Sequence, residues 1–162
     1  MVQREGVKRR VEEGKMKSIL VVALFISLGL QLVGCTTPAD THYEIGALYQ
    51  RTGDPEKAIA EFRTALRLNP NHVLAHNDLG IALAKKGDLE EAIAEFRTAL
   101  RLAPNYVSPH YELGKAFQAK GDFVLARKEF EEALRLIPQT SENQATIKTI
   151  QSNLRDLEKL QP

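Results

Sequence analysis

The sequence predicts an all-α fold built from repeated helix pairs, and three observations predict it. Two stretches, EKAIAEFRTALRLNPN at 56–71 and EEAIAEFRTALRLAPN at 90–105, are nearly identical at an offset of 34 residues, and a looser copy, VLARKEFEEALRLIPQ, occupies 124–139. Apolar residues inside the copies recur with helical spacing. A Gly-Asp pair stands before each copy, where one helix would end and the next begin.

The residues before the repeats have the layout of a secretory signal peptide. From Met16, a single Lys17 precedes an apolar stretch from Ile19 to Leu30, and small or polar residues follow. Counted from Met16 the leader has an ordinary length, so we expect residues 16–34 to be the signal peptide and 1–15 to be an upstream misreading of the start. The alternative is an uncleaved membrane helix, since residues 18–39 carry no charge.

Cys35 is the only cysteine, which excludes an internal disulfide and any cysteine-based metal cluster. The segment Leu32-Val33-Gly34-Cys35 resembles the lipobox of bacterial lipoproteins. The resemblance implies that Cys35 carries a diacylglyceryl group, that a peptidase cuts just before it, and that its freed amine is acylated. Several acyl chains make a stable membrane anchor, whereas one does not. Residues 35–38 then form a short lipidated tether.

The 34-residue copies define three blocks, 39–72, 73–106 and 107–140. Small residues, aromatic rings and prolines recur at the same places in all three, among them Gly46/Gly80/Gly114, Gly53/Gly87/Gly121, Ala58/Ala92/Ala126, Phe62/Phe96/Phe130 and Pro70/Pro104/Pro138. The period and this pattern resemble the tetratricopeptide repeat, a helix–turn–helix unit. The resemblance implies an α-solenoid of three such units, which is about the minimum for a stable array.

Block two shows how each unit is predicted to fold. Its apolar spacing predicts helices at about 73–86 and 89–102. Gly87 is expected to end the first helix in the left-handed conformation, and Asp88 to cap the second, with Glu91 completing a capping box. In block one, Pro55 is expected at the first helical position.

Residues 141–162 leave the repeat but keep helical spacing at Ile147, Ile150, Leu154, Leu157 and Leu160. We expect a capping helix that covers the apolar end of block three. A partner-binding or dimerising helix is the alternative.

The sequence shows no recognisable metal-binding or catalytic motif. His42, His76 and His110 recur once per repeat, at the fourth position where the tetratricopeptide family often has Trp, so we expect them to serve packing. His72 and His76 could share a helix face, but the sequence offers them no obvious carboxylate or cysteine ligand nearby. The acidic pairs 90–91 and 131–132 are interpreted as solvated starts of second helices. We therefore expect no metal, no cofactor and no enzymatic activity.

Charge and the family resemblance together indicate the kind of partner. Residues 35–162 hold 16 Lys and Arg against 18 Asp and Glu, so a nucleic-acid partner is not expected. In the tetratricopeptide family the first helices line a concave groove that holds a peptide or helix. Carried over by position, the groove residues are Tyr43, Ala47, Gln50, Asn77, Ile81, Lys85, Tyr111, Lys115 and Gln118. Some relatives clamp chaperone carboxyl termini, but Tyr43 and Ala47 stand where that clamp would lie.

The sequence therefore predicts a lipid-anchored scaffold or adaptor that assembles or stabilises a complex of the bacterial envelope, of which pilus and secretion assemblies are examples. In a Gram-negative cell, Thr36 after the cysteine, in place of Asp, favours the periplasmic face of the outer membrane. The alternative is a non-catalytic regulatory subunit of an envelope or cell-wall enzyme.

Overall fold

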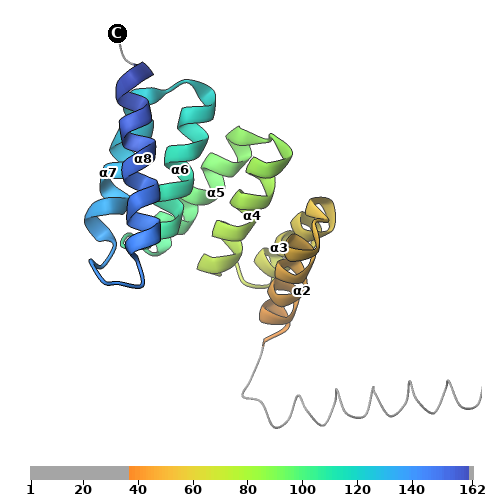
Figure 1. Cartoon of the computed structure of the whole chain (residues 1–162). Helices are drawn as coiled ribbons and strands as arrows, with labels where there is room; N and C mark the ends of the chain where they lie inside the picture. Colours follow the sequence, from red (N-terminus) through yellow and green to blue (C-terminus); the bar gives the residue numbers. More distant parts are fainter. Residues whose placement is uncertain (1–36, 161–162) are drawn as a thin grey trace, which may run out of the picture. The chain divides into compact units, whose positions relative to one another are not determined.

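The computed structural model describes residues 37–160, in which it places seven helices and no strand (Figure 1). In chain order they are α2 (Pro38–Thr52), α3 (Pro55–Leu68), α4 (Val73–Lys86), α5 (Leu89–Leu102), α6 (Val107–Lys120), α7 (Phe123–Leu136) and α8 (Gln144–Leu160). The expected signal peptide, the lipidation site Cys35 and residues 1–15 lie outside the described range. Within that range, no helix combines the length and apolar character needed to cross a bilayer.

The helices are arranged as successive pairs that stack along the chain. Each first helix packs on the second helix of its own pair, as α2 does on α3, α4 on α5 and α6 on α7. Neighbouring pairs are joined in two ways. The second helix of one pair packs on the first helix of the next, as α3 does on α4 and α5 on α6. The first helices also contact one another, α2 with α4 and α4 with α6. Figure 1 shows this progression from α2 to α8. The first helices therefore form one continuous layer.

A tight turn separates the two helices of each pair. Gly87 has a φ of +97°, in the left-handed region that side chains rarely adopt, and the Asp88 N–H donates to the Leu83 carbonyl at 3.0 Å. This bond, from just beyond the helix back into its last turn, is the Schellman closure. Gly53 and Gly121 repeat it with φ of +83°. The expected helix bounds in block two and the role of Gly87 are confirmed.

The caps of the second helices differ from one another. In α3, Pro55 occupies the first helical position as expected, and the Asp54 carboxylate accepts a hydrogen bond from the Lys57 N–H at 3.3 Å. The expected capping box at Asp88 and Glu91 is wrong: Asp88 stands at the N-cap, but its side chain makes no capping bond. Its carboxylate instead accepts from Lys86 Nζ at 2.7 Å, because the preceding lysine offers a charged donor within reach.

The core contains one phenylalanine per pair, which lies against one glycine of the first helix. Phe62, Phe96 and Phe130 are fully buried. A Cβ atom placed on Gly46, Gly80 or Gly114 would lie 2.6 to 2.7 Å from the ring of the phenylalanine in the same pair. The missing side chain is thus what lets the two helices approach with the ring between them.

The last helix closes the core after α7. Helix α8 packs on α7, and it buries Ile147, Ile150 and Leu157 while Leu154 is partly buried. Ile150 and Leu157 belong to the same apolar cluster as Phe130. This is the placement expected of a capping helix, since the face that α8 covers would otherwise be apolar and exposed.

Candidate functional site: the groove of the first helices

One face of helix α4 carries two of the expected groove residues, Ile81 and Lys85. Leu74, Asp78, Ile81 and Lys85 follow one another at intervals of three or four residues, so their side chains lie on the same side of α4. Asp78 stands near one end of this face and Lys85 at the other. We call this set the α4 groove face.

A cleft of about 200 Å³ lies between the carboxyl-terminal halves of α4 and α6. Three of the expected groove residues line it, namely Ile81, Lys85 and Lys115, together with Ala84, Leu89, Glu112, Ala116 and Ala119. Five of these eight residues are apolar, and Lys85, Lys115 and Glu112 are charged. Lys115 Nζ lies 2.9 Å from a Glu112 carboxylate oxygen and 5.4 Å from the centre of the Tyr111 ring. Lys85 forms no ion pair with any residue in 37–160.

A chain of side-chain hydrogen bonds crosses the first helices of all three repeats. The Tyr43 hydroxyl donates to Asp78 Oδ2 at 3.0 Å, and Asn77 Nδ2 donates to Asp78 Oδ1 at 2.8 Å. The Ser108 hydroxyl then donates to Asn77 Oδ1 at 3.2 Å. Asn77 is only 2% exposed, so its amide forms hydrogen bonds within this network and not with solvent. Two expected groove residues, Tyr43 and Asn77, therefore position Asp78, which sequence reasoning did not select.

The remaining expected groove residues lie on the same first helices with different degrees of burial. Ala47 packs against the core and Tyr111 sits on the Phe130 ring, with ring centres 5.8 Å apart. Gln50 and Gln118 are half-buried. Gln50 Oε1 is enclosed without a hydrogen-bond partner among the described residues. All four side chains are thus half-buried, and only part of each reaches solvent.

Asp78 influences the two tyrosines beside it. Burial, together with the nearby Asp78 carboxylate and its hydrogen bond, raises the pKa of Tyr43 far above its usual value. Burial and then Asp78 also raise the pKa of Tyr106, while the Ser108 hydroxyl partly offsets this. Both phenols stay protonated at physiological pH. The Asp78 carboxylate thus lies near enough to the Tyr43 and Tyr106 side chains to affect both electrostatically.

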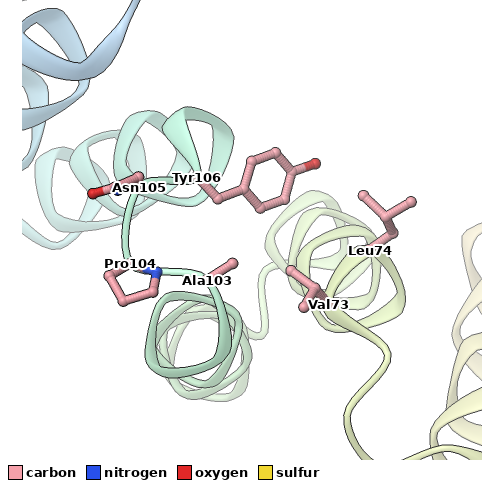
Figure 2. Close-up of a pocket in the computed structure, with 6 residues that line it drawn as sticks. All are labelled: Val73, Leu74, Ala103, Pro104, Asn105 and Tyr106. Carbon is pink, nitrogen blue, oxygen red and sulfur yellow. The ribbon is translucent and has the colours of Figure 1, made fainter.

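A second hollow lies at the amino-terminal end of the α4 groove face. This Leu74 pocket has a volume of about 480 Å³ and is lined by Val73, Leu74, Ala103, Pro104, Asn105 and Tyr106. Figure 2 shows Val73 and Leu74 on the start of α4, facing Tyr106 and Ala103 from the connection between α5 and α6. Leu74 is 44% exposed. Sequence reasoning missed these residues. A signal was present, because Leu74 and Tyr106 stand where the preceding repeat has the polar residues Asp40 and His72.

The recurrent histidines each bond a glutamate of the second helix in the same pair. The distances from Nδ1 to the carboxylate are 2.6 Å for His42–Glu61, 2.6 Å for His76–Glu95 and 2.7 Å for His110–Glu129. This agrees with a packing role inside each unit. The signal was available in the sequence, since a glutamate follows each histidine at the same interval of 19 residues.

Two expectations about charged residues need correction. His72 and His76 do have carboxylates close by, because His72 Nε2 lies 3.3 Å from Asp40 and His76 contacts Glu95. Each histidine has a different carboxylate, and no group of three or more possible metal ligands gathers within residues 37–160. Glu131 and Glu132 lie late in α7 and not at its start, because α7 begins at Phe123.

Comparisons with known proteins identify the repeats. Two family models, each described as tetratricopeptide repeat, match residues 43–107 and 83–149. Comparison with curated protein sequences gave no match.

Solved structures show the same fold at low sequence identity. The TPR2B domain of yeast Sti1, in a complex with an Hsp70 peptide, has a TM-score of 0.70 at 19% identity, over 76% of this chain and 98% of that one. The Yersinia enterocolitica type III secretion chaperone SycD, in complex with a peptide of the translocator YopD, has a TM-score of 0.72 at 16% identity, over 76% and 95%. The first repeat domain of Spaghetti (RPAP3), bound to the HSP90 peptide SRMEEVD, has a TM-score of 0.63 at 21% identity, over 72% and 93%. The helix pairs, their glycine–phenylalanine packing and the matching models together identify residues 43–149 as tetratricopeptide repeats.

Proposed function

We propose that this protein is a lipid-anchored adaptor of the bacterial envelope that holds a segment of a partner protein in the groove of its first helices. The observation that carries the binding role is the α4 groove face, which joins the Leu74 pocket and the Lys85 cleft and carries a carboxylate between them. Apolar hollows with a few placed polar groups are typical of ligand-binding sites.

The comparisons support the binding role by analogy of fold. Three similar structures, from yeast Sti1, SycD and RPAP3, are complexes with peptides or peptide-containing partners. The absence of a catalytic constellation in the sequence favours an adaptor over an enzyme.

The anchoring role rests on the sequence around Cys35. The lipobox-like segment ends at this cysteine, and α2 begins at Pro38, three residues later. At about 3.3–3.6 Å for each extended residue, such a tether spans at most about 11 Å. An array held so close to a bilayer would meet partners that are themselves membrane-associated or part of the cell wall.

Intact-protein mass spectrometry and membrane fractionation test the anchor. The proposal expects a mature chain that begins at Cys35 and carries acyl mass, and it expects Cys35→Ala to leave the membrane fraction. A full-length chain without acyl mass that stays in membranes in both forms would indicate an uncleaved signal anchor. A chain with intact Cys35 recovered only in the soluble fraction would contradict the envelope role.

A further inference from the structure

The Leu74 pocket replaces a polar contact found at the preceding junction between repeats. Leu74 and Tyr106 occupy the positions that Asp40 and His72 occupy 34 residues earlier. At that first junction, Asp40 Oδ1 lies 3.3 Å from His72 Nε2, and the Tyr43 ring packs on the His72 ring with centres 4.9 Å apart. At the second junction, two large apolar side chains instead border an open pocket of about 480 Å³.

A carboxylate that pairs with no cationic side chain of residues 37–160 lies beside this pocket. Asp78 follows Leu74 by one helical turn, so the two side chains are neighbours on the α4 groove face. The Asp78 oxygens accept hydrogen bonds from Tyr43 and Asn77, yet Asp78 forms no ion pair with any residue in 37–160. An ionised carboxylate offers about four acceptor positions, and these two donors use only half of them.

The surroundings of Asp78 favour a cationic group. The carboxylate is half-buried, and partly buried charges are normally balanced by an opposite charge. Tyr43 and Tyr106 lie close enough to Asp78 for its charge to raise the pKa of both phenols. Aromatic rings attract Lys and Arg side chains in addition to the carboxylate. The amino-terminal end of the groove is thus complementary to a basic side chain that enters next to an apolar one.

We propose that this end of the groove binds an extended segment of the partner that places a bulky apolar side chain in the Leu74 pocket and a Lys or Arg, two residues away, against Asp78. Four residues of helix advance about 6 Å from Leu74 to Asp78. In an extended peptide, side chains two positions apart lie on one side at about 6.6 Å, so the two spacings agree. This inference rests on the proposed function, since the segment belongs to the groove's partner.

Peptide binding to the full chain in detergent micelles tests the inference. The probes are fluorescein-labelled GSKSFSG and its reverse order GSFSKSG, with GSESFSG and GSKSSSG as matched controls and the acidic SRMEEVD for comparison. Fluorescence anisotropy should show that at least one Lys–Phe peptide binds about tenfold or more tightly than either control. A difference of this size is expected from burying one apolar side chain or from pairing one charge. Equal binding of all the peptides would overturn the inference.

Two variants separate the contributions of the pocket and the charge. Leu74→Asp combined with Tyr106→His recreates the polar pair that the fold already accepts at the first junction. It should abolish the preference of the tighter-binding Lys–Phe peptide over GSKSSSG. Asp78→Asn should abolish the preference of that same peptide over GSESFSG. Leu125→Ser is the matched control, since Leu125 on α7 is 42% exposed, close to the 44% of Leu74, and does not line the pocket. Preferences that survive both pocket and charge variants would place the peptide elsewhere and overturn the assignment.

Failure of this inference is distinguishable from failure of the adaptor role. A partner that crosslinks to the Lys115 region in membranes, with no discrimination among the peptides, would retain the adaptor and remove the proposed specificity. Loss of both would remove the groove as a binding site.

Discussion

Gly80 and Phe96 face one another so closely that a Cβ atom on Gly80 would lie 2.6 Å from Phe96 Cε1. The ring is fully buried and belongs to the central apolar cluster, so it has no room to move aside. The same relationship recurs between Gly46 and Phe62 and between Gly114 and Phe130. One glycine in each first helix thus sets the distance between the two helices of its pair.

Gly80→Ala is expected to lower the free energy of unfolding. Overpacking a core typically costs about 1–3 kcal/mol, whereas Ala gains only about 1 kcal/mol over Gly in a helix interior. Urea-induced unfolding followed by circular dichroism measures the difference. In a double-mutant cycle with Phe96→Leu, the loss caused by Gly80→Ala should shrink, because the smaller side chain leaves space for the methyl group. An unchanged loss would show that the ring is not the obstacle.

Gly87→Ala is expected to destabilise the protein for a different reason. Gly87 has a φ of +97°, and a Cβ added there would meet no atom within 4 Å, so backbone strain and not crowding would cause the loss. The left-handed conformation costs an ordinary residue about 1–2 kcal/mol. Gly87→Asn should lose less, since asparagine visits this conformation more readily. Equal unfolding midpoints for the two variants would contradict this explanation.

The contact between His76 and Glu95 should make stability depend on pH. His76 Nδ1 lies 2.6 Å from the Glu95 carboxylate and Nε2 lies 2.9 Å from the Pro70 carbonyl oxygen, so both ring nitrogens face acceptors and the imidazolium suits the site. The hydrogen bond to Glu95 raises the pKa of His76, burial and Arg101 oppose it, and the Pro70 carbonyl adds to it.

Because the folded state raises this pKa, the stabilisation is fully present below the unfolded value of about 6.5 and is lost as the pH rises through the folded value. The advantage of the wild type over Glu95→Gln in urea unfolding should therefore shrink from pH 6 to pH 9. Glu91→Gln, on the same helix and paired with Arg63, is the control and should show no such trend. A constant difference for Glu95→Gln would refute the linkage.

The two aspartates that precede α3 and α5 should respond differently to substitution. Asp54 caps α3 through the Lys57 N–H, whereas the Asp88 side chain makes no capping bond to α5. Asp54→Ala is therefore expected to lower the unfolding midpoint more than Asp88→Ala, because only the first leaves a helix N–H without its side-chain acceptor. The reverse order would mean that the Asp88 contact with Lys86 matters more than the cap and the Asp54–Lys57 ion pair together.

The sequence was sufficient for the features that repeat and insufficient for those that differ between repeats. Gly87, Pro55 and the helix bounds of block two could be predicted because local backbone chemistry determines them. The capping role of Asp88 could not, since two acceptable partners, the helix N–H and Lys86, compete for one carboxylate. The Leu74 pocket could not be predicted either, because its walls come from α4 and from a connection about 30 residues later, and only the packing of helix pairs brings them together.

The adaptor role is tested most directly by site-specific photocrosslinking in intact membranes. A photoreactive residue at Lys115, which borders the groove cleft, should capture a membrane-associated protein, and Cys35→Ala should abolish the capture. The same residue at Val124, which is 74% exposed on α7 and does not line the cleft, should not capture it. Capture of the same protein from both positions, or an unchanged yield without Cys35, would contradict an anchored adaptor that binds through the groove of its first helices.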